Sequence, residues 1–447
     1  MFEVPRNYAS PSAGRRLRLF GRSVRKHERP IVPHSQTDLE NLEKNPYMVF
    51  LEGGPGFGNR EPQESPLTRM ALNRGYQLLF LDYRGTGNST PINAEHLRKE
   101  GGPNEQADYL KLFRADNIVR DLEAVRQCLT ADFPEEKKKW SIFGQSFGGF
   151  VALSYLSKYP QGLREAFMTG GLAPIKRTAD EVYRATYKKV VERNEAYYKK
   201  FPEDELNVKR VAEHIRNKGG IPLPAGGLLT VKRLLSLGLS FGGHGGLDSV
   251  HSMILKLVTD LDQFGFFTRA ALSAFEQQLP LDANPIYAIL HEPIYNFKKG
   301  VASNWAAYRV GGEFRQFSWL PDRPDVGLSE ILSPEPLFFS GEMIYPFHFE
   351  TYPELARMKE AARILASFDD WEDDLYDEEQ LRRNEVPVYA ASYVDDMYVD
   401  FEFARETASM VKGIQVFETN NMYHNAVRAR TDEVLGQLFR MRDDSID

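Results

Sequence analysis

The segment from Gly144 to Gly148 reads Gly-Gln-Ser-Phe-Gly and matches the pattern G-x-S-x-G, a tight turn that carries a reactive serine between a strand and a helix. Its flanks have the matching texture, because residues 139–143 read as a short strand and an apolar run of helical length begins at Phe150. The strained turn requires glycine on both sides of Ser146, since a side chain there would collide with a neighbouring strand or helix. The sequence therefore predicts a strand, a turn and a helix, with Ser146 as a nucleophile.

Several short apolar runs alternate with longer helical patterns along the chain. This alternation is typical of an α/β fold with a mostly parallel sheet covered by helices. Residues 115–129 carry apolar side chains at helical spacing and predict an amphipathic helix that leads back to the Ser146 strand. The expected strands are residues 17–24, 47–51, 78–81, 139–143, 165–169, 386–391 and 414–418.

The middle of the chain differs in texture from the two ends. After Pro174 comes a long, charge-rich helical region, then a glycine-rich stretch at 242–246, with few strand signals for well over a hundred residues. A chain of 447 residues suits a large domain with an insertion. We expect a sheet domain formed by residues 1–172 and 371–447, and a large, mainly helical cap formed by residues 173–370, inserted after the sixth strand.

Composition and charge restrict the class of protein. The chain has 56 Lys and Arg against 63 Asp and Glu, a net charge of −7, which argues against nucleic acid as a partner. No N-terminal apolar segment or membrane-length run is present, so we expect a cytoplasmic protein without membrane contact. The single cysteine, Cys128, falls in an apolar helical pattern and is expected to be buried. The acidic run at 369–374 is expected to be a solvated charged face, not a metal site.

Serine needs an adjacent base, and the base needs an acid that holds it in the useful tautomer. On the expected fold these follow the nucleophile in the order acid, then histidine, each after a late strand. His424 follows the strand at 414–418 and is the predicted base. Asp395 and Asp396 follow the preceding strand, and only one of these neighbours can face His424.

The tetrahedral intermediate of acyl transfer needs backbone donors for its oxyanion. The glycine-rich loop at 52–58 follows the strand at 47–51 and can supply one donor, the N–H of Gly54 or, second, of Gly53. The other expected donor is the N–H of Phe147. The loop lacks both phosphate-binding glycine patterns, so a nucleotide site is disfavoured. A second polar loop, at 82–89, is expected to brace the oxyanion loop.

Four motifs together are specific: G-G-P-G-F-G from Gly53, D-Y-R-G-T-G-N-S-T from Asp82, G-Q-S-F-G-G-F from Gly144, and D-D-M-Y-V from Asp395. The chain resembles the prolyl aminopeptidases, or proline iminopeptidases, of the α/β-hydrolase superfamily, in particular their longer subgroup with an enlarged cap. Residues 285–295 and 341–344 resemble that subgroup's cap segments, so the resemblance covers nearly the whole chain. It also favours Asp396 over Asp395, because the family's acid is followed by methionine.

The resemblance implies a serine exopeptidase that removes proline from short peptides with a free N-terminus, without metal or organic cofactor. Such an enzyme must hold a cationic imino group, so carboxylates should point from the cap toward Ser146. Glu292 and Glu342 are the candidates, although a buried glutamate paired with an arginine is the alternative for each. Phe147 and Tyr155 are the aromatic residues expected for the proline ring.

One departure and two alternatives accompany this interpretation. Glu52 stands where the family often has histidine before G-G-P-G. A general esterase or amidase would share the catalytic residues but would need no carboxylate in the cap. A non-catalytic ligand-binding homologue of the hydrolases is the third reading, and the complete set of nucleophile, base, acid and oxyanion donors speaks against it. The sequence does not indicate an oligomeric state.

Overall fold

The computed structural model describes residues 1–12, 14–27, 31–32, 35–36, 42–65, 67–321 and 326–444. Its centre is a seven-stranded sheet in which six strands run parallel and β3, at one edge, runs antiparallel to β5. This confirms the α/β fold class. In spatial order the strands are β11 (Ile414–Thr419), β10 (Val388–Tyr393), β7 (Leu163–Thr169), β6 (Trp140–Gln145), β4 (Tyr47–Leu51), β5 (Gln77–Leu81) and β3 (Gly21–Val24).

The early strand expected at 17–24 is divided into two. β2 (Arg16–Leu19) pairs with β1 (Phe2–Pro5) in a separate ribbon, whereas β3 joins the large sheet. β7 is thus the fifth strand of the large sheet along the chain and the seventh overall, and the long insertion follows it. The other expected strands lie within two residues of the observed ones at their starts, and the helix expected at 115–129 is α5 (Ala115–Leu129).

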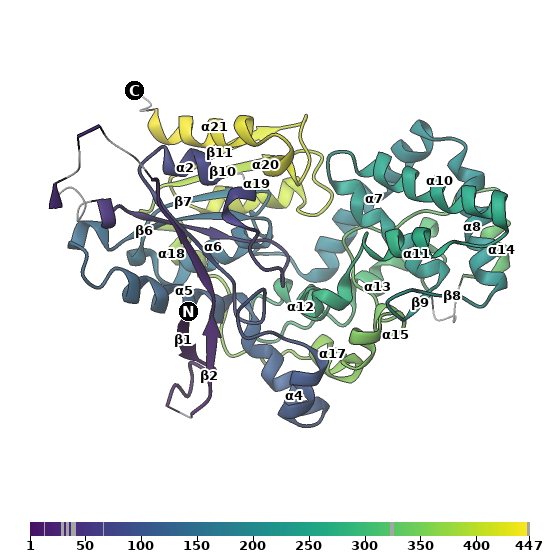
Figure 1. The fold of residues 1–447 in the computed structure, drawn as a ribbon, viewed down its shortest axis with the longest axis horizontal. Coiled ribbons are helices and arrows are strands. Elements are labelled where there is room, and N and C mark those ends of the chain that lie inside the picture. Colours follow the sequence, from purple (N-terminus) through teal and green to yellow (C-terminus); the bar gives the residue numbers. More distant parts are fainter. Residues whose placement is uncertain are drawn as a thin grey trace.

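Helices cover both faces of the sheet (Figure 1). Because side chains alternate along a strand, the two faces contribute to two separate cores. One face packs against α5 and α6 (Phe147–Lys158), and the other against α2 (Thr68–Leu72) and α21 (Thr431–Asp443). The remaining helices of this part are α3 (Ala94–Glu100), α4 (Pro103–Leu110), α18 (Glu378–Arg382), α19 (Phe401–Met410) and α20 (Ala426–Ala429).

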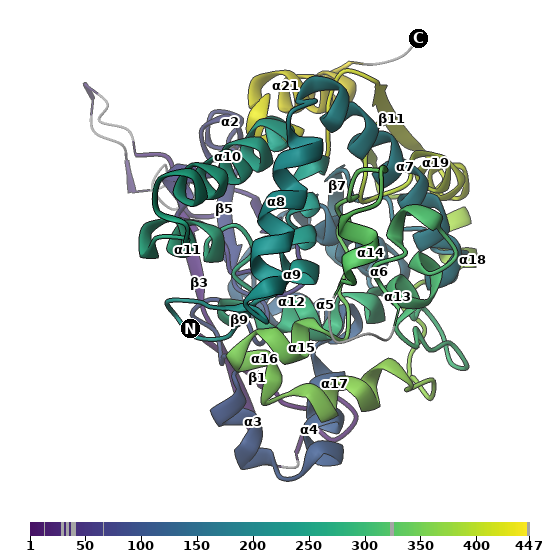
Figure 2. The same ribbon diagram turned by 90° about the vertical axis from the view of Figure 1, so that its right-hand side faces the viewer.

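Between β7 and α18 the described chain adds no strand to the large sheet and forms helices beside it, at the right of Figure 1 and facing the viewer in Figure 2. A short ribbon of β8 (Ile221–Pro222) and β9 (Leu228–Leu229) is the one pairing in this region among the described residues. The helices are α7 (Ala179–Lys200), α8 (Asp204–Asn217), α9 (Val231–Leu235), α10 (Gly246–Phe264), α11 (Arg269–Glu276), α12 (Pro285–Leu290), α13 (Ala306–Gly311), α14 (Leu328–Ile331), α15 (His348–Thr351), α16 (Pro353–Ala356) and α17 (Lys359–Ala366).

The prediction for Cys128 is wrong, because its side chain is exposed. On α5 the buried stripe passes through Ile118, Leu122 and Val125. Cys128 lies one residue before the end of the helix, beyond Val125, which is the last buried residue of α5. As to membrane contact, the described residues include no helix with both the length and the apolarity needed to cross a bilayer.

Candidate active site

The turn around Ser146 has the geometry that its glycines predict. Ser146 lies between β6 and α6 with a φ of +56°, a conformation that a side-chain-bearing residue seldom adopts. A Cβ added to Gly144 would lie 2.4 Å from the carbonyl oxygen of Gly148. A Cβ added to Gly148 would lie 2.0 Å from the carbonyl oxygen of Leu51 in β4. Both glycines are therefore required by close backbone contacts, one with the helix and one with the neighbouring strand.

The structure brings Ser146, His424 and Asp396 together from three separate loops. His424 Nε2 lies 2.8 Å from Ser146 Oγ, and His424 Nδ1 lies 2.8 Å from Asp396 Oδ2. A carboxylate can only accept, so Nδ1 carries the proton and Nε2 is left to accept the serine proton. The second carboxylate oxygen, Oδ1 of Asp396, accepts the N–H groups of Tyr398 and Val399 at 2.8 and 3.0 Å.

Asp395, the alternative acid, points elsewhere. Its carboxylate lies 3.4 Å from Lys189 Nζ in α7, and its side chain is 43% exposed. Asp396 is only 3% exposed. Of the two neighbours, the geometry assigns the contact with His424 to Asp396.

Opposing effects act on the pKa of His424. Burial disfavours the charged imidazole, whereas the Asp396 carboxylate favours it through charge and hydrogen bonding. Glu342 adds to the effect of Asp396, and Arg428 opposes it. The net result is a pKa above the ordinary histidine value. The base therefore binds a proton more readily than a free histidine, which suits an imidazolium formed during catalysis.

The glycine-rich loop after β4 lies against the nucleophile. A Cβ added to Gly53 would be 3.1 Å from the Cβ of Ser146. The N–H of Gly53 donates to Oε1 of Glu52 at 3.0 Å and is occupied. Phe147 is the first residue of α6, so its N–H has no acceptor within the helix. This arrangement favours Gly54, the next residue, over Gly53 as the second donor.

The loop at 82–89 braces the oxyanion loop through Asp82. One carboxylate oxygen accepts the N–H of Asn59 at 2.7 Å, and the other accepts the N–H of Asn88 at 2.8 Å. Tyr83 also donates its hydroxyl to the carbonyl of Glu52 at 3.3 Å. The two loops are thus held together at the carboxyl ends of β4 and β5.

Glu342 lies on the cap side of the triad. Its carboxylate accepts the hydroxyl of Tyr287 at 2.9 Å and is near enough to His424 to raise the pKa of that imidazole. The side chain is half-buried. Among the described residues no arginine or lysine pairs with it, so the alternative of a buried glutamate neutralised by arginine does not apply here.

Glu292 is more deeply enclosed. Its carboxylate accepts the N–H groups of Ala306 and Ala307 at 3.1 and 2.9 Å, at the start of α13. From the sequence, the alternative for Glu292 was a buried glutamate paired with an arginine. In the structure the positive end of α13 is the partner of this carboxylate instead. Burial outweighs these hydrogen bonds and raises the pKa of Glu292 to about 7.

Comparisons with known proteins identify the family of the chain. The family model described as alpha/beta hydrolase fold matches residues 46–210. A proline iminopeptidase of Aspergillus aculeatus is 41% identical over 447 residues, covering 100% of this chain and 93% of that protein. A proline iminopeptidase of Aeromonas sobria is 40% identical over 443 residues, covering 99% and 96%. The chain belongs to the proline iminopeptidase family. A solved proline iminopeptidase structure from Mycobacterium smegmatis aligns over 99% of each chain, with 12% identity and a TM-score of 0.44.

One expected substrate contact of this family member is wrong. Tyr155 is completely buried and donates its hydroxyl to Glu123 of α5 at 2.8 Å. Its ring packs against Trp140, the first residue of β6, so it lies at the amino end of that strand. Ser146 follows the carboxyl end of the same strand, at the opposite edge of the sheet. Tyr155 is a core residue and does not reach the site.

Two aromatic residues that the sequence did not single out for the site, Tyr183 and Tyr295, are within electrostatic reach of both cap carboxylates. Glu292 and Glu342 both act electrostatically on the buried hydroxyls of Tyr183 and Tyr295. Those two rings contact each other at 5.9 Å, edge to face. The Tyr183 hydroxyl is buried without a hydrogen-bond partner among the described residues. The only sequence signal for these residues was their place in tyrosine-rich cap segments.

Aromatic contacts continue from this pair to the nucleophile turn. The ring of Tyr295 lies 6.3 Å from that of Phe150, which lies 6.3 Å from that of Phe147. On the other side of the triad, the ring of Tyr398 lies 4.6 Å from the imidazole of His424. Phe147 is thus the one aromatic residue proposed from the sequence that remains beside the serine.

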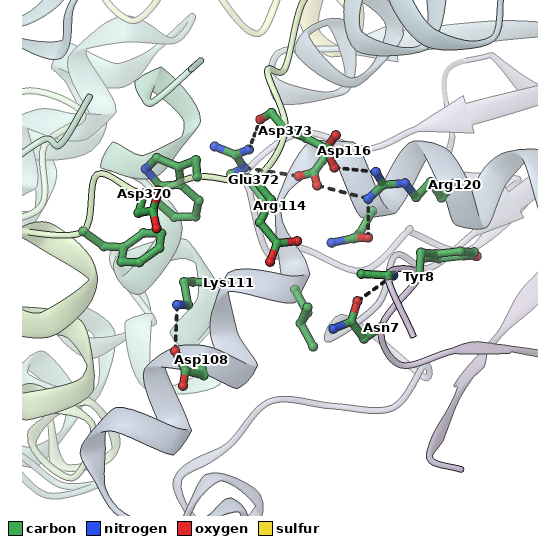
Figure 3. A pocket seen from close by; sticks show the side chains of 15 residues that line it. Asn7, Tyr8, Asp108, Lys111, Arg114, Asp116, Arg120, Asp370, Glu372 and Asp373 are labelled. Atoms are coloured by element: carbon green, nitrogen blue, oxygen red, sulfur yellow. Dashed lines mark hydrogen bonds and ion pairs between the residues drawn. The ribbon is translucent and has the colours of Figure 1, made fainter. Parts of the chain in front are cut away.

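The acidic run at 369–374 borders a cavity of about 440 Å³ that no triad residue lines (Figure 3). Its carboxylates are partly neutralised: Asp373 pairs with Arg120 of α5, and Asp370 pairs with Lys299 at 2.5 Å. Arg114 also donates to the carbonyl of Asp373 at 2.6 Å. Within the described ranges, no three His, Cys, Asp or Glu side chains are arranged to hold a metal ion. The run thus joins the cap's end to α5.

Proposed function

We propose that the protein releases N-terminal proline from short peptides through a covalent acyl-enzyme on Ser146. The observation that carries this proposal is the combination of the Ser146, His424 and Asp396 contacts with the electrostatic influence of a cap carboxylate, Glu342, on the histidine. Membership of the proline iminopeptidase family over the whole chain supports it.

In the proposed reaction, Ser146 Oγ attacks the carbonyl carbon of the first residue while His424 Nε2 takes the serine proton. The N–H groups of Phe147 and Gly54 stabilise the oxyanion. The C–N bond then breaks, and His424 gives its proton to the leaving amine. Water attacks the prolyl ester with His424 again as base, which releases proline and restores the serine hydroxyl. Asp396 holds the imidazole in its tautomer throughout. Every step uses groups of the chain and water.

Specificity is proposed to come from the cap, which we take as residues 173–370. The cationic imino group binds Glu342, and the Tyr183 hydroxyl accepts a hydrogen bond from it. Glu292 adds to the negative electrostatic potential that acts on this cation. Such an acidic wall excludes a peptide in which another residue precedes the proline, because an uncharged amide nitrogen there would leave the carboxylates desolvated and unpaired. Phe147, with the rings that contact it, is proposed to hold the proline ring. We propose a cytoplasmic location for the enzyme.

The nucleophile is tested with proline 4-nitroanilide and the variant Ser146→Ala. Turnover should fall by roughly 10⁶-fold, as in serine proteases that lose the nucleophile. The fold should persist, since Ser146 contributes only its backbone to the turn. Unchanged turnover in the folded variant would refute the assignment.

Specificity is tested with the N-acetylated form of the same amide, which lacks the cation. An aminopeptidase loses this substrate, whereas a general esterase or amidase accepts both forms. Glu342→Gln should lower kcat/KM for the free amide by about 10-fold to 100-fold, the equivalent of one charged hydrogen bond. Glu195→Gln, an exposed glutamate on α7, is the matched control and should keep full activity. Equal turnover of the free and blocked amides would exclude the exopeptidase.

A further inference from the structure

Glu52 is a buried carboxylate at the start of the oxyanion loop, residues 52–58. The proline iminopeptidases often have histidine at this position. Glu52 is only 4% exposed. Its Oε1 accepts the N–H of Gly53 at 3.0 Å and lies 2.5 Å from Nη2 of Arg428. Burying a carboxylate costs free energy unless it is paired and hydrogen-bonded, so the contacts with Gly53 and Arg428 explain why a glutamate can be buried at position 52.

Arg428 belongs to the segment that carries the base. It lies in α20, four residues after His424, and its side chain is 30% exposed. The pair therefore joins two loops that are 376 residues apart in the chain. One loop carries the proposed oxyanion donor Gly54, and the other carries His424. No other ion pair among the described residues joins the loop after β4 to the segment around His424.

The same contacts affect both halves of the chemistry. By accepting the Gly53 N–H, the Glu52 side chain fixes the peptide group between Glu52 and Gly53, which directly precedes the peptide group that carries the Gly54 N–H. On the other side, Arg428 is one of four influences on the pKa of His424. Burial lowers it, Asp396 and Glu342 raise it, and the Arg428 cation lowers it. The ring of Tyr398, which lies 4.6 Å from the imidazole, is a neutral phenol.

We propose that Glu52 and Arg428 are positioning residues that hold the oxyanion loop and the histidine loop in one catalytic arrangement. Neither side chain touches the reacting atoms. The proposal rests on the proposed serine mechanism, because a donor and a base need a fixed relative position only if both act on one intermediate. Misplacement of such groups by about 1 Å can cost about 100-fold in rate.

The test compares Glu52→Gln, Arg428→Met and the double variant on proline 4-nitroanilide. Each single variant should lower kcat by roughly 10-fold to 100-fold, with KM nearly unchanged because the cap carboxylates are intact. The double variant should be no worse than the more damaged single variant, since the two residues act as one unit. Arg405→Met breaks an exposed pair with Glu418 and serves as the control, with full activity expected.

The pH profile separates positioning from mere stabilisation. Arg428→Met removes a cation that opposes protonation of His424, so the acid limb of kcat/KM should move to higher pH, whereas Glu52→Gln should not raise it. Arg428→Lys keeps the charge without the guanidinium fork. It should restore the wild-type acid limb and recover only part of kcat.

Two outcomes would overturn the proposal. One is a wild-type kcat and pH profile in folded single variants, even if their unfolding temperatures fall, which would make the pair purely structural. The other is strict additivity in the double variant. If the wild-type enzyme itself fails to cleave the prolyl amide, the proposed function fails and the pair loses its role with it. Thermal unfolding of each variant checks that the folded proteins are being compared.

Discussion

Glu292→Gln should change how stability depends on pH, and the structure gives the magnitude. The pKa of Glu292 is raised from 4.5 to about 7 by burial. Between these values the folded protein holds a proton on Glu292 that the unfolded chain has released. Unfolding then releases a proton, so stability falls as pH rises through this window. The shift of 2.5 units, from 4.5 to 7, corresponds to about 3 kcal/mol.

The assay is denaturant unfolding of wild type and Glu292→Gln at pH 4.5, 6 and 8. The quantity of interest is the free energy of unfolding of wild type minus that of the variant, because other titrating groups cancel in this difference. It should fall by about 3 kcal/mol between pH 4.5 and 8, since glutamine cannot ionise. At the lowest pH the variant should be no more stable than wild type, because a neutral glutamate side chain fits the same space.

A matched control is Glu195→Gln on α7, an exposed glutamate in the same part of the chain. Its difference from wild type should stay constant across the three pH values. A constant difference for Glu292→Gln as well would refute the reasoning, because it would mean that the carboxyl ionises equally easily in the folded and unfolded chains. A substrate cation should reduce the penalty at pH 8, so added proline amide should stabilise wild type more than the variant.

Three further predictions concern the turn, the base and the cap. Gly148→Ala should destabilise the protein by at least about 2 kcal/mol in thermal unfolding, because the added Cβ would lie 2.0 Å from the carbonyl oxygen of Leu51. The control is Gly436→Ala in α21, where the added Cβ would lie in open space, and this variant should be neutral or stabilising. The acid limb of kcat/KM should lie above pH 6.5, because activity needs neutral His424 and its pKa is raised; a limb below that value contradicts the geometry. Tyr183→Phe should leave the unfolding temperature nearly unchanged, since the hydroxyl has no partner, yet lower kcat/KM for the prolyl amide by about 10-fold; equal activity would remove this hydroxyl from the site.

Much of the catalytic core follows from local sequence rules. The strand starts were predicted within about two residues, because buried parallel strands form short apolar runs bounded by loop residues. Ser146 was recognisable because its turn tolerates only glycine at two neighbouring positions. His424 and the aspartate pair Asp395 and Asp396 were predicted from their order in the chain, because the loops that follow parallel strands lie at one edge of the sheet.

Other features depended on which way a side chain faces, and there the sequence misled. Nearly every residue of α6 is buried, so its pattern has no polar face to show that Tyr155 points to the amino end of β6. Cys128 lies beside the apolar stripe of α5, and only the packed helix shows that its side chain is exposed. Choosing Asp396 over Asp395 needed the family resemblance, which the contact with His424 supports.

The sequence by itself determined the α/β core, the nucleophile turn and the order of the catalytic residues, because each depends on short-range steric or periodic rules. Only the tertiary structure decided what surrounds them. Glu52 meets Arg428 across 376 residues, and Glu292 finds its partners in the first N–H groups of α13. The physical reason is that the environment of a buried charge is set by whichever distant groups the fold brings within a few ångströms. No local pattern encodes that distance.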